Sequence, residues 1–357
     1  MAEWWAIKPI STAFQKTRKL LLEPFSIWTW IKLLVIVFFA GTGASSISSI
    51  FSNLSNYRRR TTNAYTYTSS DANQTIHNIL SNTGLMALIV VLVIIVIAIV
   101  LLFIYLRNVF SFVLIKALAT GDVHVIRPAL DNLGKGFKLF IFTLIVAIVT
   151  VIVAAILAGL IILGVLMAIK IGVASAVSAI LVMVIALLIM ILLLLLIAFL
   201  IAAAIFFGFT YDFVAPMMLN KNMGVRGSWR YLWGSIRSNW QQYGVYVIVH
   251  FLVQIVVSIL LLIVVLPFAL TFAAIVIVGA MVATATSGTA IGLTVLIGLV
   301  LLILAAIFVI LIMFISMPVS VYFRYYSLDV LKQIDPSAIT YADKFTFPPP
   351  EQGMLPP

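Results

Sequence analysis

The amino-acid sequence predicts an all-α fold, a bundle of six membrane-spanning helices. The 357-residue chain is 64% hydrophobic and 9% charged, whereas a typical soluble domain has about 25% charged residues. From Gly244 to Phe323 the chain runs for 80 residues without an Asp, Glu, Lys or Arg. Because a helix needs about 20 apolar residues to cross the hydrocarbon layer, this stretch alone holds two spans, with a turn expected at Thr284–Gly288.

Six apolar segments define the predicted spans and divide the chain into three parts. The spans are expected at residues 28–48, 84–107, 139–168, 176–208, 244–280 and 290–323. Residues 1–27 form a polar, basic, amphipathic segment without the pattern of a cleavable signal peptide. Residues 28–326 form the membrane domain, and 327–357 form a Pro-rich cytoplasmic tail that is expected to be disordered. The charge-free stretch 171–211 would be about 60 Å long as one helix, so it is tilted, projects from the membrane or is broken.

The distribution of basic residues predicts a multi-pass cell-membrane protein with both termini in the cytoplasm. Seventeen of the 21 Lys and Arg residues lie in the chain up to Lys32, in the 107–138 and 212–243 regions and in the chain from Arg324 onward, and positively charged loops are retained in the cytoplasm. The triplet Arg58–Arg60, in the predicted outside loop, opposes this bias. The same loop has two glycosylation sequons, at Asn53 and Asn73, whose modification depends on this topology and on a cell that glycosylates.

Three cytoplasmic segments have an apolar stripe at helical spacing and are expected to lie flat at the inner headgroup layer. One begins at Pro9, one follows Pro128, and one follows Ser228, which is expected to cap it. Each basic residue near an anionic surface contributes on the order of 1 kcal/mol, and Trp favours this depth. The candidate headgroup contacts are Lys16, Arg18, Lys19, Lys135, Lys138, Arg226, Arg230 and Arg237, and the candidate interfacial anchors are Trp28, Trp30, Trp229, Trp233 and Trp240.

These helices have three interpretations that the residues leave open. They anchor a multi-span protein and satisfy its charge bias, they form a lipid-headgroup or membrane-shaping surface, or they dock a soluble partner. The net charge of +11 is divided among short membrane-adjacent segments that have no recognition motif, so we reject nucleic-acid binding.

A weak internal repeat suggests three helical hairpins with the same orientation. Phe112-Val113 and Phe213-Val214 each end a long apolar helix, and Pro318 follows the sixth span as Pro216 follows the fourth. Parallel repeats also occur in transporters, but those have polar or ionisable groups at the membrane midplane. The one intramembrane polar pair to consider here is His250 and Gln254, one helical turn apart.

Two stretches of sequence carry a resemblance to known membrane proteins. They contain Pro24-Phe25, Trp30, Lys32-Leu33, Phe38-Phe39 and Gly41, and then Phe112-Val113, Ala117-Leu118, Gly121, Arg127-Pro128, Asn132-Leu133-Gly134-Lys135-Gly136 and Leu139-Phe140. The chain resembles an uncharacterised group of archaeal multi-span membrane proteins and, more loosely, the membrane domain of some glycerophosphodiester phosphodiesterases. The resemblance implies a six-span module in an archaeal cell membrane. It does not imply phosphodiesterase activity, because the metal-binding His and Glu motif has no counterpart among His77, His124 and His250.

Sequence motifs for catalysis are absent, and we expect no enzyme activity, cofactor or metal. The chain has no HExxH, GxSxG or Walker motif and no paired intramembrane aspartates. It has no cysteine, which excludes disulfides and thiolate metal sites. We therefore expect a membrane scaffold or membrane-organising component that contacts anionic lipids. The alternatives are a transporter or channel for an apolar or lipidic solute and a membrane subunit of a larger complex. Lipids, further copies of the chain or a membrane complex are the expected partners.

Overall fold

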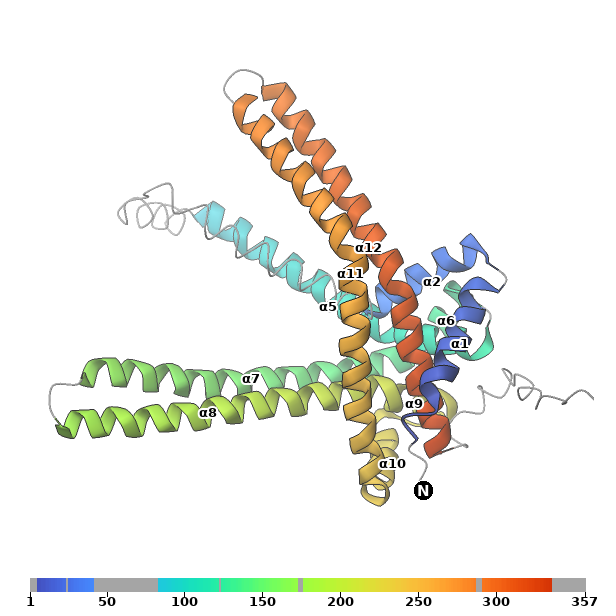
Figure 1. The fold of residues 1–357 in the computed structure, drawn as a ribbon, viewed down its shortest axis with the longest axis horizontal. Helices are drawn as coiled ribbons and strands as arrows, with labels where there is room; N and C mark the ends of the chain where they lie inside the picture. Colours follow the sequence, from blue (N-terminus) through green and yellow to red (C-terminus); the bar gives the residue numbers. More distant parts are fainter. Residues whose placement is uncertain are drawn as a thin grey trace, which may run out of the picture. The chain divides into compact units, whose positions relative to one another are not determined.

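A computed structural model describes residues 5–23, 25–41, 83–121, 123–172, 176–286 and 291–335, and within these ranges the protein is all-α, without a β-strand (Figure 1). The elements are α1 (Pro9–Leu22), α2 (Ile27–Ala40), α5 (Thr83–Thr120), α6 (Ile126–Asp131), α7 (Leu133–Ile171), α8 (Ala176–Phe209), the π-helical turn η2 (Thr210–Val214), α9 (Ala215–Asn220), α10 (Val225–Ser238), α11 (Trp240–Thr286) and α12 (Ile291–Ile334). The predicted sequons at Asn53 and Asn73, the Arg58–Arg60 triplet and residues 336–357 of the tail lie outside the described residues.

Five helices in the described ranges are long and apolar enough to cross a membrane. They are Met86–Thr120, Leu133–Ile171, Val177–Asn220, Trp240–Ala285 and Gly292–Ile334. Each corresponds to one predicted span and extends beyond it, because the helix continues from the apolar stretch into the neighbouring basic segment. The protein is therefore a multi-pass membrane-type helical protein.

The predicted first span, 28–48, is not confirmed as a span. Helix α2 has 14 residues, about 21 Å at 1.5 Å per residue, which is too short for the hydrocarbon layer. It ends at Gly41, whose φ of 70° is left-handed and whose backbone N–H donates to the carbonyl oxygen of Phe38. Glycine adopts this conformation without steric cost and commonly ends helices. Residues 42–48 lie outside the described part of the chain.

The long charge-free stretch 171–211 is interrupted near its start. Helix α7 ends at Ile171 and α8 begins at Ala176, close to the predicted boundary. After Phe209 the helix widens into η2 and then continues as α9 to Asn220. A π-helical turn is a local insertion in an α-helix, so α8, η2 and α9 together form one long, irregular helix.

The chain divides into two compact units, one formed by Met1–Gly136 with Gln241–Pro357 and the other by Phe137–Trp240. In the first unit, α1 packs along α12, and α2 packs on α5 and α12. Most of its buried side chains come from the C-terminal parts of α5 and α12 and from the stripes of α1 and α2 that face them. Leu114, Leu118, Met317 and Tyr326 are among those that are almost completely buried.

In the second unit, α7 and α8 run side by side as a helical hairpin (Figure 1). A Cβ added at Gly164 of α7 would lie 3.0 Å from Cγ1 of Ile189 of α8, so the helices approach closely at this glycine. The buried part of the unit is at the other end of the hairpin, where Phe213, Val214 and Met217 of η2 and α9 are inaccessible to solvent.

The apolar parts of the spanning helices carry large side chains on their outer surface. Val151 is 66% exposed, Leu194 is 60% exposed and Leu302 is 70% exposed. Burying apolar surface stabilises a protein in water by roughly 25 cal/mol per Å², so a water-soluble protein rarely leaves so much of it uncovered. These surfaces suit contact with lipid, in which helices satisfy their backbone hydrogen bonds internally.

Candidate functional site

Exposed cationic and aromatic side chains come together on α10 and the residue that begins α11. We call this set, Arg226, Arg230, Trp233, Arg237 and Trp240, the α10 surface. The three arginines are exposed, and Trp233 and Trp240 are 61% and 68% exposed. Indole rings prefer the headgroup level of a bilayer, and guanidinium groups form bidentate hydrogen bonds to phosphate. The α10 surface therefore has the side-chain chemistry of a lipid-headgroup contact.

The opposite face of α10 is packed against the protein. Val225, Ser228 and Leu232 are buried, and the helix contacts η2 and α9. The Lys221 ammonium lies 3.7 Å from the centre of the Tyr231 ring, a cation–π distance that joins the loop after α9 to α10. This packing fixes which face of α10 is left exposed.

The structure differs in three respects from what the sequence predicts around α10. Ser228 does not cap the helix: α10 begins three residues earlier, after Gly224, and the buried Ser228 hydroxyl has no hydrogen-bond partner among the residues that the structure describes. Gly224, whose backbone is extended, occupies the N-cap position instead. Trp229 is half-buried, and its ring stacks on Phe206 of α8 at 4.4 Å between centroids. The predicted stripe is also interrupted at Asn239, so Trp240 belongs to the next helix.

The predicted cationic contacts of α1 lie in different surroundings. Lys16 forms an ion pair with Asp329 of α12, and the same carboxylate accepts a hydrogen bond from Thr12 at 3.2 Å. Arg18 lies 3.6 Å from Glu23, and both side chains are more than half exposed. Lys19 is exposed as well. Lys16 thus joins two helices, while Arg18 and Lys19 remain on the outer surface.

Lys135 and Lys138 lie in the first two turns of α7. Lys135 is half-buried and Lys138 is exposed. The segment that follows Pro128 is not one amphipathic helix, because it bends at Asn132 between α6 and α7. The Asn132 amide donates a hydrogen bond to the Pro128 carbonyl oxygen at 2.8 Å, which closes the end of α6. Side-chain bonds of this kind compete with helix continuation.

Trp28 and Trp30 of α2 have different roles in the structure. Trp28 is 70% exposed. The Trp30 indole N–H donates a hydrogen bond to the Leu21 carbonyl oxygen at 2.8 Å, and its ring stacks on Phe314 at 5.8 Å. Trp30 therefore connects α1, α2 and α12 within the first unit.

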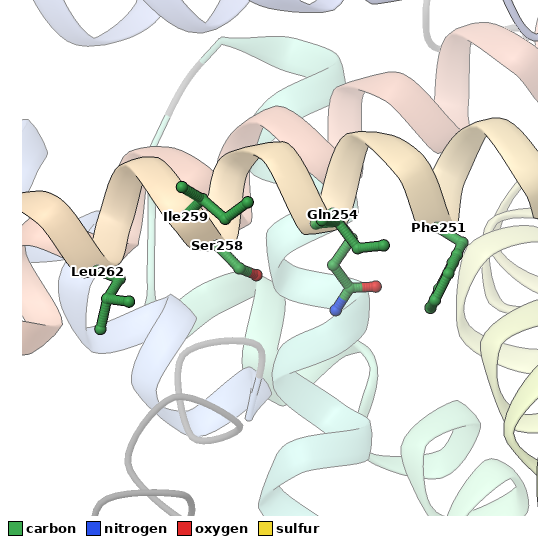
Figure 2. A pocket seen from close by; sticks show the side chains of 6 residues that line it. Phe251, Gln254, Ser258, Ile259 and Leu262 are labelled. Atoms are coloured by element: carbon green, nitrogen blue, oxygen red, sulfur yellow. The ribbon is translucent and has the colours of Figure 1, made fainter.

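His250 and Gln254 of α11 lie in different environments although they are one turn apart. The centre of the His250 ring lies 5.1 to 6.0 Å from the ring centres of Phe323, Tyr246 and Tyr326, and its buried Nδ1 has no hydrogen-bond partner in the described part of the chain. Gln254 lines an open groove of about 440 Å³ with other side chains of α11, and Figure 2 shows it projecting from the same side as Ser258 and Leu262. The structure thus separates the predicted pair by environment.

A buried polar contact that was not predicted from the sequence joins α5 and α12. Arg324 is 4% exposed, and its guanidinium donates a hydrogen bond to the Ser111 hydroxyl at 3.0 Å. The signal was present in the spacing of Ser316, Ser320 and Arg324, which recur every four residues and so share one helix face. The bias of basic residues toward the cytoplasm instead predicts Arg324 at the inner membrane surface.

Comparisons with known proteins identify the family. Comparison with curated proteins and with solved structures gives no match. The described residues contain no cluster of three or more His, Asp or Glu side chains that would bind a metal ion. Residues 4–339 match the model of the Family of unknown function (DUF7544), almost the whole length of the chain, and the protein therefore belongs to this family.

Proposed function

We propose that this protein is a non-enzymatic membrane-organising component that holds anionic lipid headgroups at the inner face of the cell membrane. The α10 surface is the observation that carries this proposal. Its three exposed arginines and Trp233 lie on a helix whose other face is buried against η2 and α9, and the exposed Trp240 follows at the start of α11. The archaeal membrane implied by the sequence resemblance and the cytoplasmic location of both termini are part of the proposal.

The position of α10 within its unit supports a headgroup contact. Helix α8 has 34 residues, about 50 Å at 1.5 Å per residue, and its exposed apolar side chains suit the hydrocarbon layer. It leads directly into η2, on which α10 packs. Helix α10 therefore packs beside the end of the long apolar helix, and this position supports a contact with headgroups.

The groove on α11 gives less support to the alternative of solute transport. It is lined by Phe251, Gln254, Ile255, Ser258, Ile259 and Leu262, all from one helix. His250, the other member of the candidate intramembrane polar pair, packs among aromatic rings. A transporter midplane site is formed where several helices or repeats meet. A one-sided groove suits a neighbouring helix better than an enclosed solute.

Removal of two arginines from the α10 surface tests the proposal. Native mass spectrometry of the full-length protein, titrated with an anionic and a zwitterionic phospholipid, measures how many lipids of each kind are retained. Because each basic residue near an anionic surface contributes about 1 kcal/mol, Arg230→Ala with Arg237→Ala should weaken anionic-lipid retention by about 2 kcal/mol, or about 30-fold. Retention of the zwitterionic lipid should change little.

Lys170→Ala provides the matched control. Lys170 is exposed near the end of α7 at the hairpin turn, remote along the hairpin from α10. This variant also removes basic charge, but from the surface predicted to face outside, and should retain anionic lipid like the native protein. Equal retention by the double Arg variant, the Lys170 variant and the native protein would contradict the proposal.

A further inference from the structure

We infer that the groove face of α11, formed by Phe251, Gln254, Ile255, Ser258, Ile259 and Leu262, is a contact between two copies of this chain. This contact goes beyond the proposed headgroup role and does not rest on it.

The groove face presents polar groups on a surface that is otherwise apolar and exposed. Phe251 is 61% exposed, Ile259 is 53% exposed and Leu262 is 60% exposed. Gln254 and Ser258 are exposed between them, and Figure 2 shows both side chains projecting into the groove of about 440 Å³. An open volume of this size on a helix surface can receive side chains from a second helix.

Gln254 lies well inside the apolar part of the protein. It is ten residues beyond Gly244, the start of the charge-free stretch, which corresponds to about 15 Å along a helix. Placing an amide in hydrocarbon without a hydrogen-bond partner costs several kcal/mol. A serine hydroxyl can bond to a carbonyl of its own helix one turn earlier, but a glutamine amide has two donor hydrogens and an acceptor oxygen. Gln254 therefore needs a partner outside α11.

The chain's other apolar segments offer Gln254 no complementary amide. Within residues 84–106, 139–169, 176–209 and 244–323, it is the only Asn or Gln. The hydroxyls of Thr143 and Thr150 on α7 already donate to carbonyl oxygens of their own helix. An amide is complementary to itself, and a two-fold axis brings identical residues face to face. The Gln254 amide of a second copy can therefore donate a hydrogen bond to the Gln254 amide of the first copy and accept one from it.

The spacing of the groove residues also fits a helix pair. Phe251, Ile255, Ser258 and Leu262 follow one another at intervals of four, three and four residues. This is the spacing of the seam in a left-handed coiled coil, in which side chains of one helix insert between those of the other. Helices in membranes commonly pair in this geometry, and side-chain amides and hydroxyls hydrogen-bond across the contact.

Because the native chain has no cysteine, single-cysteine crosslinking tests the contact in the full-length protein. In proteoliposomes treated with an oxidant, Ser258→Cys should form a disulfide-linked dimer. Val256→Cys is the matched control, since Val256 is 57% exposed and lies two residues away, about 200° around the helix. It should give little dimer. Adding Gln254→Leu to Ser258→Cys should weaken dimer formation by about 3- to 20-fold, as expected for loss of an interhelical polar contact in a membrane.

Three outcomes would overturn the inference. The first is that Ser258→Cys and Val256→Cys crosslink equally, the second is that Gln254→Leu leaves the dimer fraction unchanged, and the third is that no dimer forms. A photocrosslinker at position 254 that links only to another segment of the same chain would identify an intramolecular partner and also contradict it. Arg230→Ala with Arg237→Ala should leave the Ser258→Cys crosslink intact, so failure of the headgroup proposal and failure of this one are distinguishable.

Discussion

Arg324 illustrates how this protein places a charge inside its helical core. The residue is 4% exposed and donates a hydrogen bond to Ser111. A buried charge is tolerated only when its hydrogen-bonding groups are satisfied. The two tyrosines that follow it are anchored in the same way: Tyr325 donates to the Leu118 carbonyl oxygen at 3.2 Å and Tyr326 to that of Ala6 at 3.0 Å. The end of α12 is thus held by polar contacts to two other segments.

Removal of the Ser111 hydroxyl should destabilise the first unit. Ser111→Ala leaves the Arg324 guanidinium without this acceptor, and a hydrogen bond to a charged group contributes about 1.5–3 kcal/mol. We expect a lower apparent Tm for the full-length protein in detergent. Ser238→Ala is the control, because Ser238 is exposed and such changes usually alter stability by less than about 0.5 kcal/mol. Equal Tm values for the two variants would show that the Ser111 contact does not contribute.

At the scale of single helices, the sequence predicts some helix ends and misses others. The start of α1 at Pro9 was predicted because proline favours the first helical turn. The start of α10 was missed because the cap is Gly224 and not a hydrogen-bonding side chain. The length of α2 was overestimated because the residues after Gly41 are small and weakly polar. Apolar composition alone does not show where such a helix stops.

The two faces of α10 should respond differently to truncation. Leu232 is completely buried and Trp233 is 61% exposed. Leu232→Ala removes buried methyl groups and should lower stability by about 2–5 kcal/mol, which a thermal or denaturant unfolding scan would detect. Trp233→Ala should leave stability almost unchanged and reduce anionic-lipid retention. If Trp233→Ala were the more destabilising variant, the assigned orientation of α10 would be wrong.

At the scale of the whole molecule, composition predicts membrane spans but not how distant segments meet. Five of the six predicted spans correspond to long apolar helices. A charge-free run of such length rarely forms any structure other than a membrane helix. The hydrogen bond of Tyr326 to Ala6 joins residues 320 positions apart, and no local sequence pattern predicts it. Helices that are apolar on all sides also lack the periodicity that marks a buried face in soluble proteins. Their polar contacts, such as Arg324 with Ser111, emerge only when the helices are placed together.

The proposed orientation predicts which positions are accessible from each side of the membrane. In cells expressing single-cysteine variants of the cysteine-free chain, a membrane-impermeant maleimide should label Lys170→Cys directly. It should label Ser238→Cys only after permeabilisation. The expectation follows from the retention of basic segments in the cytoplasm. The reverse labelling pattern would place the α10 surface outside and remove the inner-leaflet part of the proposed function.

The most direct test of the central claim is the environment of position 233. An environment-sensitive fluorophore attached to Trp233→Cys in the full-length protein, reconstituted into nanodiscs, reports whether this face of α10 contacts lipid. We predict blue-shifted emission that is quenched more by brominated anionic lipid than by brominated zwitterionic lipid, with the difference lost in the Arg230→Ala, Arg237→Ala background. Water-like emission without quenching by either lipid would contradict the assignment of the α10 surface to the headgroup layer.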